Sequence, residues 1–175
     1  IKARVISNAL ADIIADSDKV IVMGHKRPDF DAVGACVGIY TFSKIVGKEC
    51  YIILNDSDRD ETIQKVMFEI DNSDEQLSKV FVDSDEAWEL MTPQTTLIVV
   101  DTSDASRVID AAILSKANRK VIIDHHRRGE DIITNPLLTY IEPYASSSSE
   151  LIAELIEYQT KIEKITPIAA TIMLG

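Results

Sequence analysis

The chain has 175 residues and a mass of 19.4 kDa, the size of a single globular domain. It is 46% hydrophobic and 27% charged, which excludes a disordered or fibrous chain. The net charge of −11 argues against duplex nucleic acid as a partner, because an acidic surface repels polyanions. Bound divalent cations would still allow a phosphorylated substrate. The two cysteines fit a reducing compartment, and no apolar run reaches the ~20 residues that span a bilayer.

Helical and strand patterns alternate along the chain. In the first half we expect helices at residues 3–15, 31–46 and 60–70, and strands at 19–23, 49–54 and, more weakly, 79–82. In the second half we expect helices at 84–91, 106–115 and 147–158, strands at 96–100 and 120–123, and an edge strand or a simple link at 138–141. Three strand runs are almost continuously apolar, which is typical of parallel strands covered on both faces. The predicted fold class is therefore α/β, with a mostly parallel sheet and helices on both faces.

Local signals predict how some of these elements begin and end. Gly47 stands where the helix at 31–46 would need a C-cap. The serines before Glu150 resemble a capping box for the helix at 147–158. The last segment, 166–175, is apolar and ends without a cap or a polar tail, so we expect its element to continue beyond Gly175.

The histidines occur only directly after predicted strands, and each has carboxylates beside it. His25, Asp29 and Asp31 follow the first strand, Asp101 follows the strand at 96–100, and Asp124, His125 and His126 follow the strand at 120–123. The carboxyl ends of parallel strands share one edge of a sheet, and open α/β sheets bind ligands at that edge. We therefore expect these side chains to converge on one crevice.

Each of these residues taken alone has a simpler explanation. An aspartate after a strand is most often a helix N-cap, and Asp31 would suit that role. The Asp-Phe-Asp triplet lacks the other motifs of a kinase, and Gly24, Gly34 and Gly38 are misplaced for a dinucleotide fingerprint. The serines at 146–149 lack a Gly-x-Ser-x-Gly elbow, which favours a helix start over a nucleophile.

Taken together, the same residues predict a metal site. Several carboxylates at one edge repel one another unless a cation lies among them. Carboxylate oxygens combined with neutral imidazoles favour Mn²⁺, Mg²⁺, Fe²⁺ or Zn²⁺. One ion needs only about three or four protein ligands, and this edge offers more. Two ions ~4 Å apart that share a bridging carboxylate account for the surplus, and Asp101 is the natural bridge.

These residues resemble the motifs of the DHH phosphoesterase superfamily. The spacing His25-x3-Asp29-x-Asp31 resembles the first motif, Asp101 resembles the second, and residues 124–126 are the Asp-His-His signature that names the family. The resemblance spans most of the chain and implies two divalent metal ions, for which we expect Mn²⁺, with the native metal left open.

Within the superfamily, one branch is most similar. Residues 23–35 and 140–150 look most like the corresponding segments of membrane-anchored cyclic-di-AMP phosphodiesterases. Phe30 stands where the oligoribonuclease branch more often has Gly between the two aspartates. The resemblance implies a phosphodiesterase that opens cyclic-di-AMP to the linear dinucleotide with a hydroxide activated by two metals. A nanoRNA or pyrophosphate hydrolase of the same superfamily and a catalytically silent nucleotide-binding module are the alternatives.

The resemblance also implies a role for each residue. His25 and Asp29 would bind one metal, Asp31 and His125 the other, Asp101 would bridge them, His126 would contact the scissile phosphate, and Asp124 would orient a ligating imidazole. Ser147 and Ser148, in the serine segment at 145–150, would contact the substrate. The basic residues around the two His motifs would either neutralise substrate phosphates or remain solvated loop charges; they are Lys26, Arg27, Arg127 and Arg128.

The resemblance further implies that residues 1–175 are a fragment of a longer protein. The family has a final aspartate ligand beyond a segment like 166–175, and then a second domain that binds substrate. The similar branch also has membrane helices and sensory domains at its amino terminus. The chain would then be a cytoplasmic catalytic domain without membrane contact of its own. The full-length protein would be anchored in the cell membrane, and a homodimer of that protein is possible.

Overall fold

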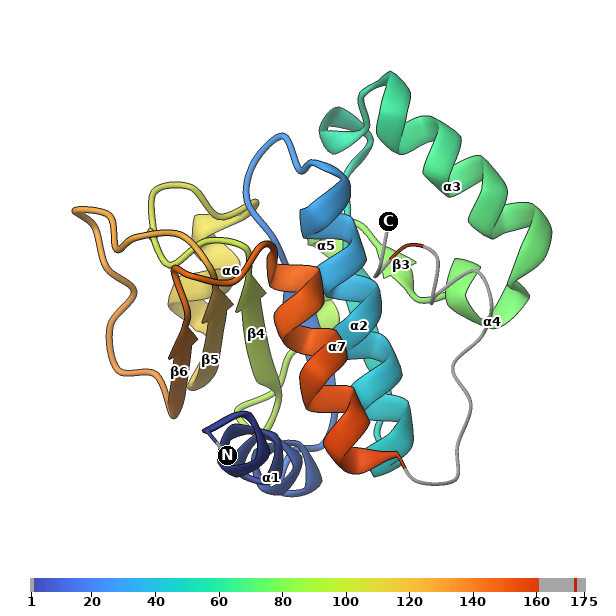
Figure 1. Ribbon diagram of the computed structural model, residues 1–175. Coiled ribbons are helices and arrows are strands. Elements are labelled where there is room, and N and C mark those ends of the chain that lie inside the picture. Colours follow the sequence, from blue (N-terminus) through green and yellow to red (C-terminus); the bar gives the residue numbers. More distant parts are fainter. Residues whose placement is uncertain (1, 161–171, 173–175) are drawn as a thin grey trace.

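The computed structural model describes residues 2–160 and residue 172, and its helices and strands alternate along the chain (Figure 1). The helices are α1 (Lys2–Ala15), α2 (Phe30–Val46), α3 (Glu61–Ser73), α4 (Glu75–Ser78), α5 (Ser84–Leu90), α6 (Ala111–Lys116) and α7 (Ser148–Gln159), with a 3₁₀ turn, η1, at Asp56–Asp58. The strands are β1 (Val20–Met23), β2 (Cys50–Ile53), β3 (Phe81–Val82), β4 (Thr96–Val100), β5 (Arg119–Asp124) and β6 (Leu138–Ile141).

The strands of this part of the chain form one parallel sheet in the order β3-β2-β1-β4-β5-β6. The predicted α/β class is thus confirmed. The weak run at 79–82 contains β3, and the segment at 138–141 is an edge strand, not a simple link. The chain winds outward from β1 to β3 and then from β4 to β6 on the other side. The order therefore reverses between β1 and β4, where open α/β sheets bind their ligands.

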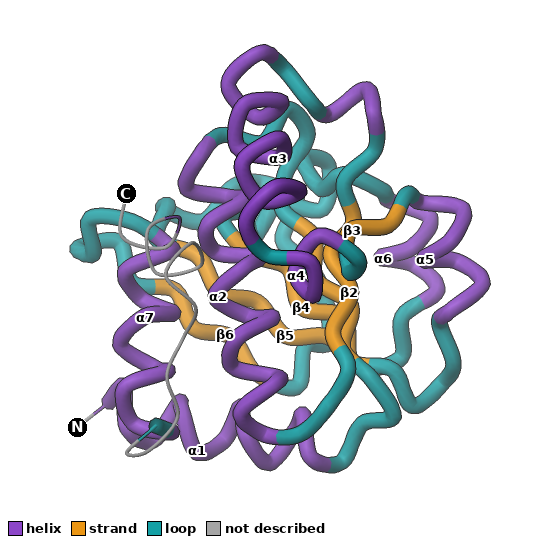
Figure 2. The backbone as a smooth tube through the Cα atoms, turned by 90° about the vertical axis from the view of Figure 1, so that its right-hand side faces the viewer, coloured by secondary structure: helices purple, strands orange, loops and turns teal. Residues whose placement is uncertain are grey.

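Helices cover both faces of the sheet (Figures 1 and 2). Helices α1, α2 and α7 bury residues such as Phe42 and Leu155 against one face, whereas α5 and α6 bury residues such as Ile113 against the other. Successive strand residues point to opposite faces, so Val22 enters the first core and Met23 the second. Burial on both faces explains why these strands are apolar throughout and do not alternate with polar residues.

Helix α2 begins at Phe30 and is capped by Asp29, whose side chain accepts a hydrogen bond from the Ala32 N–H at 2.8 Å. The alternative in which Asp31 caps this helix is therefore wrong. Asp31 lies in the first turn of α2, and its carboxylate contacts other elements. At the other end Gly47 has a left-handed φ of 90°, which confirms the predicted C-cap.

The helix predicted at 106–115 is wrong in its first half. Helix α6 begins at Ala111, where Asp110 accepts a hydrogen bond from the Ile113 N–H at 3.0 Å. The preceding residues form a loop that returns to the end of β1, with Val108 in an antiparallel bridge to His25. Local helix propensity is a weak preference, and here the pairing with a distant segment outweighs it.

Helix α7 begins close to where the sequence predicts. Ser147 accepts a hydrogen bond from the Glu150 N–H at 3.0 Å, as in a capping box, while the Glu150 side chain contacts the Ser146 hydroxyl. The continuation predicted for the segment at 166–175 lies outside the described residues. Within those residues, every helix is too short or too polar to cross a membrane.

Candidate metal centre

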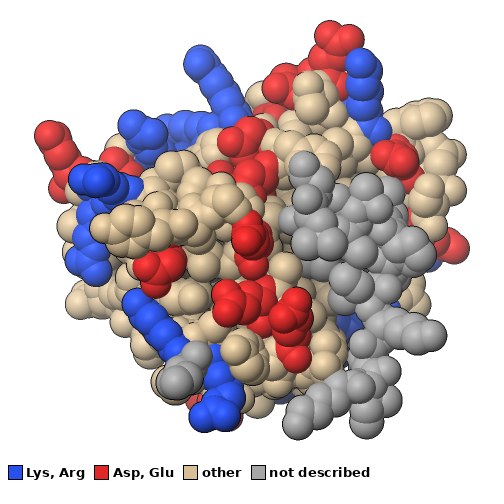
Figure 3. Space-filling view, in the orientation of Figure 1, with Lys and Arg blue, Asp and Glu red and all other residues tan. Residues whose placement is uncertain are grey.

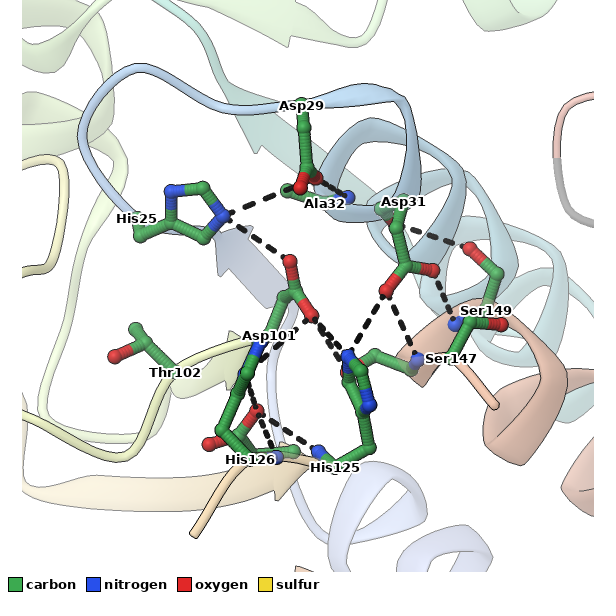
Figure 4. Close-up of polar contacts among 12 residues, drawn as sticks. His25, Asp29, Asp31, Ala32, Asp101, Thr102, His125, His126, Ser147 and Ser149 are labelled. Carbon is green, nitrogen blue, oxygen red and sulfur yellow. Dashed lines mark hydrogen bonds and ion pairs between the residues drawn. The ribbon is translucent and has the colours of Figure 1, made fainter. Parts of the chain in front are cut away.

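The predicted ligand residues meet at the carboxyl edge of the sheet, beside the reversal between β1 and β4 (Figure 4). His25 follows β1, Asp101 follows β4, and His125 and His126 follow β5. Asp29 and Asp31 come from the start of α2, and the first residues of α7 close the other side. Segments of the chain that are distant in sequence thus build one cluster, as the strand-tip argument predicts.

Asp101 lies at the centre of this cluster. Its side chain is only 1% exposed, and its backbone has a φ of 63°, in the left-handed region that Asp tolerates better than most residues. One carboxylate oxygen, Oδ2, lies 3.1 Å from His25 Nε2. The other, Oδ1, accepts a hydrogen bond from the Ser148 hydroxyl at 2.9 Å and lies 3.4 Å from His125 Nε2. The two oxygens therefore face two different groups of side chains.

The first group comprises His25, Asp29 and Asp101. Each offers a ligand atom within 4.8 Å of the others, and His25 Nε2 lies 3.8 Å from Asp29 Oδ1. The ring is oriented from its other side, because His25 Nδ1 lies 2.8 Å from the Lys26 carbonyl oxygen. Fixing one nitrogen by a backbone carbonyl leaves the other available as a ligand.

The second group surrounds the other oxygen of Asp101. His125 Nε2 lies 3.5 Å from Asp31 Oδ2 as well as 3.4 Å from Asp101 Oδ1. His126 is also close, because Asp101, His125 and His126 offer ligand atoms within 4.8 Å of one another. Both groups share Asp101, which lies between them.

The start of α7 holds the acidic ligands in place. The N–H groups of Ser148 and Ser149 donate to the two oxygens of Asp31 at 3.0 and 2.9 Å, at the helix end that carries partial positive charge. Burial alone would raise the pKa of Asp31, but the hydrogen bonds from Ser149 and Ser148 outweigh it and lower that pKa. Asp31 is therefore kept ionised.

Ser147 and Ser148, which the sequence predicts to contact the substrate, have partners within the protein. Ser148 is fully buried, and its hydroxyl is bonded to Asp101. The Ser147 hydroxyl caps α7. Ser148 thus fixes the positions of both Asp31 and Asp101, whereas Ser147 serves the helix.

Asp124 also has a different partner from the one expected. It is buried, and its Oδ1 accepts hydrogen bonds from the His125 and His126 N–H groups at 2.8 and 3.2 Å. The same oxygen lies 2.7 Å from Nδ1 of His126. Asp124 thus orients the ring of His126, and the ring of His125 is held by its contacts with Asp31 and Asp101.

Asp101 and His25 form a hydrogen-bonded pair in which the pKa of each group is raised. Burial raises the pKa of Asp101, and the like charge of Asp31 adds to this, against the hydrogen bond with His25. The hydrogen bond to Asp101 in turn raises the pKa of His25 to about 9. A divalent cation in the first group would have to displace the proton of this pair, so its binding is linked to pH.

A cavity of about 530 Å³ opens beside the cluster. Its lining includes His25, Asp29, Asp101, Asp124, His126, Lys26, Arg107, Arg127, Thr102, Ser103, Asp104, Ser106 and Gly129. Arg127 therefore lies where the sequence predicts a substrate contact, whereas Arg128 is outside this lining. Figure 3 shows acidic side chains running down the face over α7 and basic side chains projecting from its upper edge.

Arg107 and the polar residues of the loop after β4 were not predicted from the sequence. The expectation of a helix at 106–115 concealed them, because a helix would have carried Arg107 away from the strand tip. The available signal was proximity to Asp101, since residues shortly after a catalytic strand end commonly form the rim of the site.

The sequence comparison agrees with this geometry. Residues 19–175 match the DHH family, N-terminal domain, and the chain belongs to that family.

Curated relatives match along the whole chain. This chain is 43% identical over 175 residues to the cyclic-di-AMP phosphodiesterase GdpP of Bacillus subtilis and 45% identical to that of Geobacillus thermodenitrificans. Each match covers 100% of this chain. The chain spans only 26% of the length of either relative. Among solved structures, an exopolyphosphatase-related protein from Bacteroides fragilis superposes with a TM-score of 0.71 at 22% identity, over 99% of this chain and 48% of that one, which supports the fold.

We expect Ser148→Ala to weaken Mn²⁺ binding by roughly tenfold, because the hydroxyl positions the central carboxylate. The fold should survive, since the Ser148 N–H still bonds Asp31 and the loss of one buried hydrogen bond costs about 1–3 kcal/mol. Calorimetric titration with Mn²⁺ measures the effect. Ser147→Ala is the matched control and should lose only its helix cap. Equal Mn²⁺ affinities for Ser148→Ala and the wild type would contradict the positioning role.

The raised pKa of His25 predicts how the stability of the metal-free protein depends on pH. A histidine with a raised pKa stabilises the folded state fully below its unfolded value of 6.5, and this contribution is lost as the pH rises through about 9. The free energy of unfolding in EDTA should therefore fall between these pH values. Urea unfolding at a series of pH values checks this, and His25→Asn should flatten the slope. An unchanged slope in His25→Asn would assign the titration to another group.

Proposed function

We propose that the chain is the catalytic domain of a Mn²⁺-dependent phosphodiesterase that hydrolyses cyclic-di-AMP to the linear dinucleotide. The observation that carries the proposal is the buried carboxylate of Asp101, whose two oxygens face two separate groups of imidazole and carboxylate side chains. The names of the relatives that match the whole chain support the choice of substrate.

The residues present fit divalent cations. Asp31 and Asp101 are close enough to influence each other's pKa, and Asp101 is almost fully buried. Paired buried carboxylates are stable when a cation neutralises them. A donor set of imidazole nitrogens and carboxylate oxygens suits Mn²⁺ among the hard to intermediate metals. His25 and Asp29 would hold one ion, Asp31 and His125 the other, and Asp101 both.

When bound, these ions would supply Lewis-acid stabilisation of the phosphate and an activated water. His126 contributes separately. With Nδ1–H donated to Asp124 at 2.7 Å, Nε2 is left for a phosphate oxygen, and the ring lines the cavity. Held in place by the Asp124 carboxylate, the ring of His126 would contact that oxygen and stabilise its charge as the charge shifts in the transition state.

The same proposal includes the rest of the protein. The chain spans about a quarter of its curated relatives, so a second substrate-binding domain and an amino-terminal membrane anchor with sensory domains would lie outside it. This domain would then face the cytoplasm. Gel filtration of the full-length protein in detergent tests for a homodimer.

Asp101→Asn in the full-length protein tests the function. Asn keeps the size of the side chain and tolerates the left-handed backbone, so the fold should persist. We expect cyclic-di-AMP turnover to fall at least about a hundredfold and the Mn²⁺ content to fall from two ions, because one residue serves both groups. Elemental analysis and product chromatography give both quantities.

The wild type is assayed in parallel on cyclic-di-AMP, short linear RNA and pyrophosphate. Preference for RNA or pyrophosphate would favour the alternative hydrolases. Binding of nucleotide without turnover of any of the three would favour a silent module. Near-normal turnover by Asp101→Asn would contradict the two-metal proposal.

His125→Ala and His126→Ala should fail in different ways. His125 contacts the two carboxylates of the second group, so its loss should weaken Mn²⁺ binding by about tenfold or more. His126 is bonded to Asp124, so its loss should lower kcat with nearly unchanged Mn²⁺ affinity. Titration with Mn²⁺ and steady-state kinetics on both variants distinguish the two. Indistinguishable Mn²⁺ affinities would show that His126 is itself a ligand.

A further inference from the structure

Two loops are joined beside the metal centre. The Lys26 N–H donates to the Arg107 carbonyl oxygen at 2.7 Å, and the Ile109 N–H donates to the Gly24 carbonyl oxygen at 3.1 Å. Between these bonds, His25 and Val108 form an antiparallel bridge. The loop after β1 and the loop after β4 thus form a short two-stranded ribbon. Its backbone hydrogen bonds lie on either side of His25, the first residue of the ligand cluster.

Lys26 and Arg107 are directly opposite each other in this ribbon. Opposite residues of an antiparallel pair project from the same face with their Cβ atoms about 5 Å apart, and like charges in that arrangement destabilise the pair. Both side chains line the cavity of about 530 Å³ that also contains His25, Asp101 and His126. The ribbon therefore holds two cations together at the wall of the proposed catalytic cavity.

Lys26 and Arg107 make no ion pair within the described residues, although the negative charge of Asp104 acts on Arg107 at longer range. Neither cation has a carboxylate oxygen within the 4.0 Å of an ion pair there, and Lys26 Nζ instead donates to the Ser106 carbonyl oxygen at 3.4 Å. Asp104, on the same loop, accepts hydrogen bonds from the hydroxyl and N–H of Ser106 at 2.6 and 2.9 Å. These bonds, with a smaller contribution from Arg107, lower the pKa of Asp104.

We propose that Lys26 and Arg107 form a second phosphate subsite, which binds the phosphate of the dinucleotide that is not cleaved. The inference rests on the proposed function, since it assigns the second phosphate of the same substrate. A cyclic dinucleotide carries two phosphodiesters, and only one can lie at the metal centre. The other needs its own cations, and an Arg fork beside a Lys ammonium offers both planar and point-charge donors to phosphate oxygens.

The test compares Arg107→Ala and Lys26→Ala in the full-length enzyme with Mn²⁺. The substrates are cyclic-di-AMP, which has two phosphates, and bis-p-nitrophenyl phosphate, which has one. Each variant should raise KM for cyclic-di-AMP by about tenfold more than KM for the single phosphate, because one charged contact is lost. Arg107→Lys should recover part of the loss. Lys65→Ala, which removes an equally charged side chain that is 78% exposed on α3, should change neither value.

Two results would overturn the subsite. Equal losses on both substrates would mean that the ribbon only supports His25, and unchanged KM values would mean that the cations face solvent. If the wild type hydrolyses bis-p-nitrophenyl phosphate but not cyclic-di-AMP, the proposed function fails. The subsite is then tested separately, by inhibiting the hydrolysis of bis-p-nitrophenyl phosphate with a ligand that has two phosphates. The linear dinucleotide 5′-pApA should then inhibit the wild type about tenfold more strongly than Arg107→Ala. Equal inhibition would contradict the subsite in that case as well.

Discussion

The position of the Asp101 carboxylate is the constraint to which the surrounding structure is fitted. A buried carboxylate is unstable unless hydrogen bonds or cations compensate it, and here its two oxygens are served from opposite sides by His25 and Ser148. The residue takes a left-handed φ of 63° at the end of β4, so the chain turns away sharply after the strand. That turn directs the following loop back towards β1, where Val108 pairs with His25. One strand end therefore determines both the shared ligand and the wall of the cavity.

Helix α7 couples this centre to the hydrophobic core. Its first turn bonds Asp31 and Asp101, while its later residues, such as Leu155, are buried against α1 and α2. A hydrogen bond from the Ser7 hydroxyl to the Leu155 carbonyl oxygen, 2.7 Å long, ties α7 to α1 as well. Packing of apolar side chains along α7 thus sets the height of its first N–H groups above the sheet. Core packing therefore holds the carboxylates of Asp31 and Asp101 in place, and the accuracy of their positions does not depend on surface loops.

The sequence was sufficient to predict the sheet, most helices and the meeting of the ligand residues, because strand-tip positions follow from parallel topology alone. It was insufficient where a long-range contact decides the local structure. Residues 106–110 have a helical pattern, yet the pairing of Val108 with His25 holds them in a loop. Ser148 is a residue type that often contacts substrate phosphates. Only the packing of α7 shows that it is buried and that its hydroxyl bonds Asp101. Likewise, Asp124 has two histidines within reach, and side-chain geometry alone assigns it to His126.

The charge of the chain sets the remaining condition on any anionic substrate. With a net charge of −11, the protein repels a dinucleotide at long range, so attraction has to be local. In the proposed function, bound cations would neutralise the carboxylates of the cluster and provide this attraction at one end of the cavity. A substrate with a second phosphate therefore gains from cations held apart from the ligand carboxylates. In the proposed subsite, the ribbon of Lys26 and Arg107 would satisfy that requirement, because its backbone pairing keeps both cations at the cavity wall without an ion pair to a described carboxylate. Under that proposal, discrimination between one phosphate and two would follow from where the cations lie, independently of the overall charge.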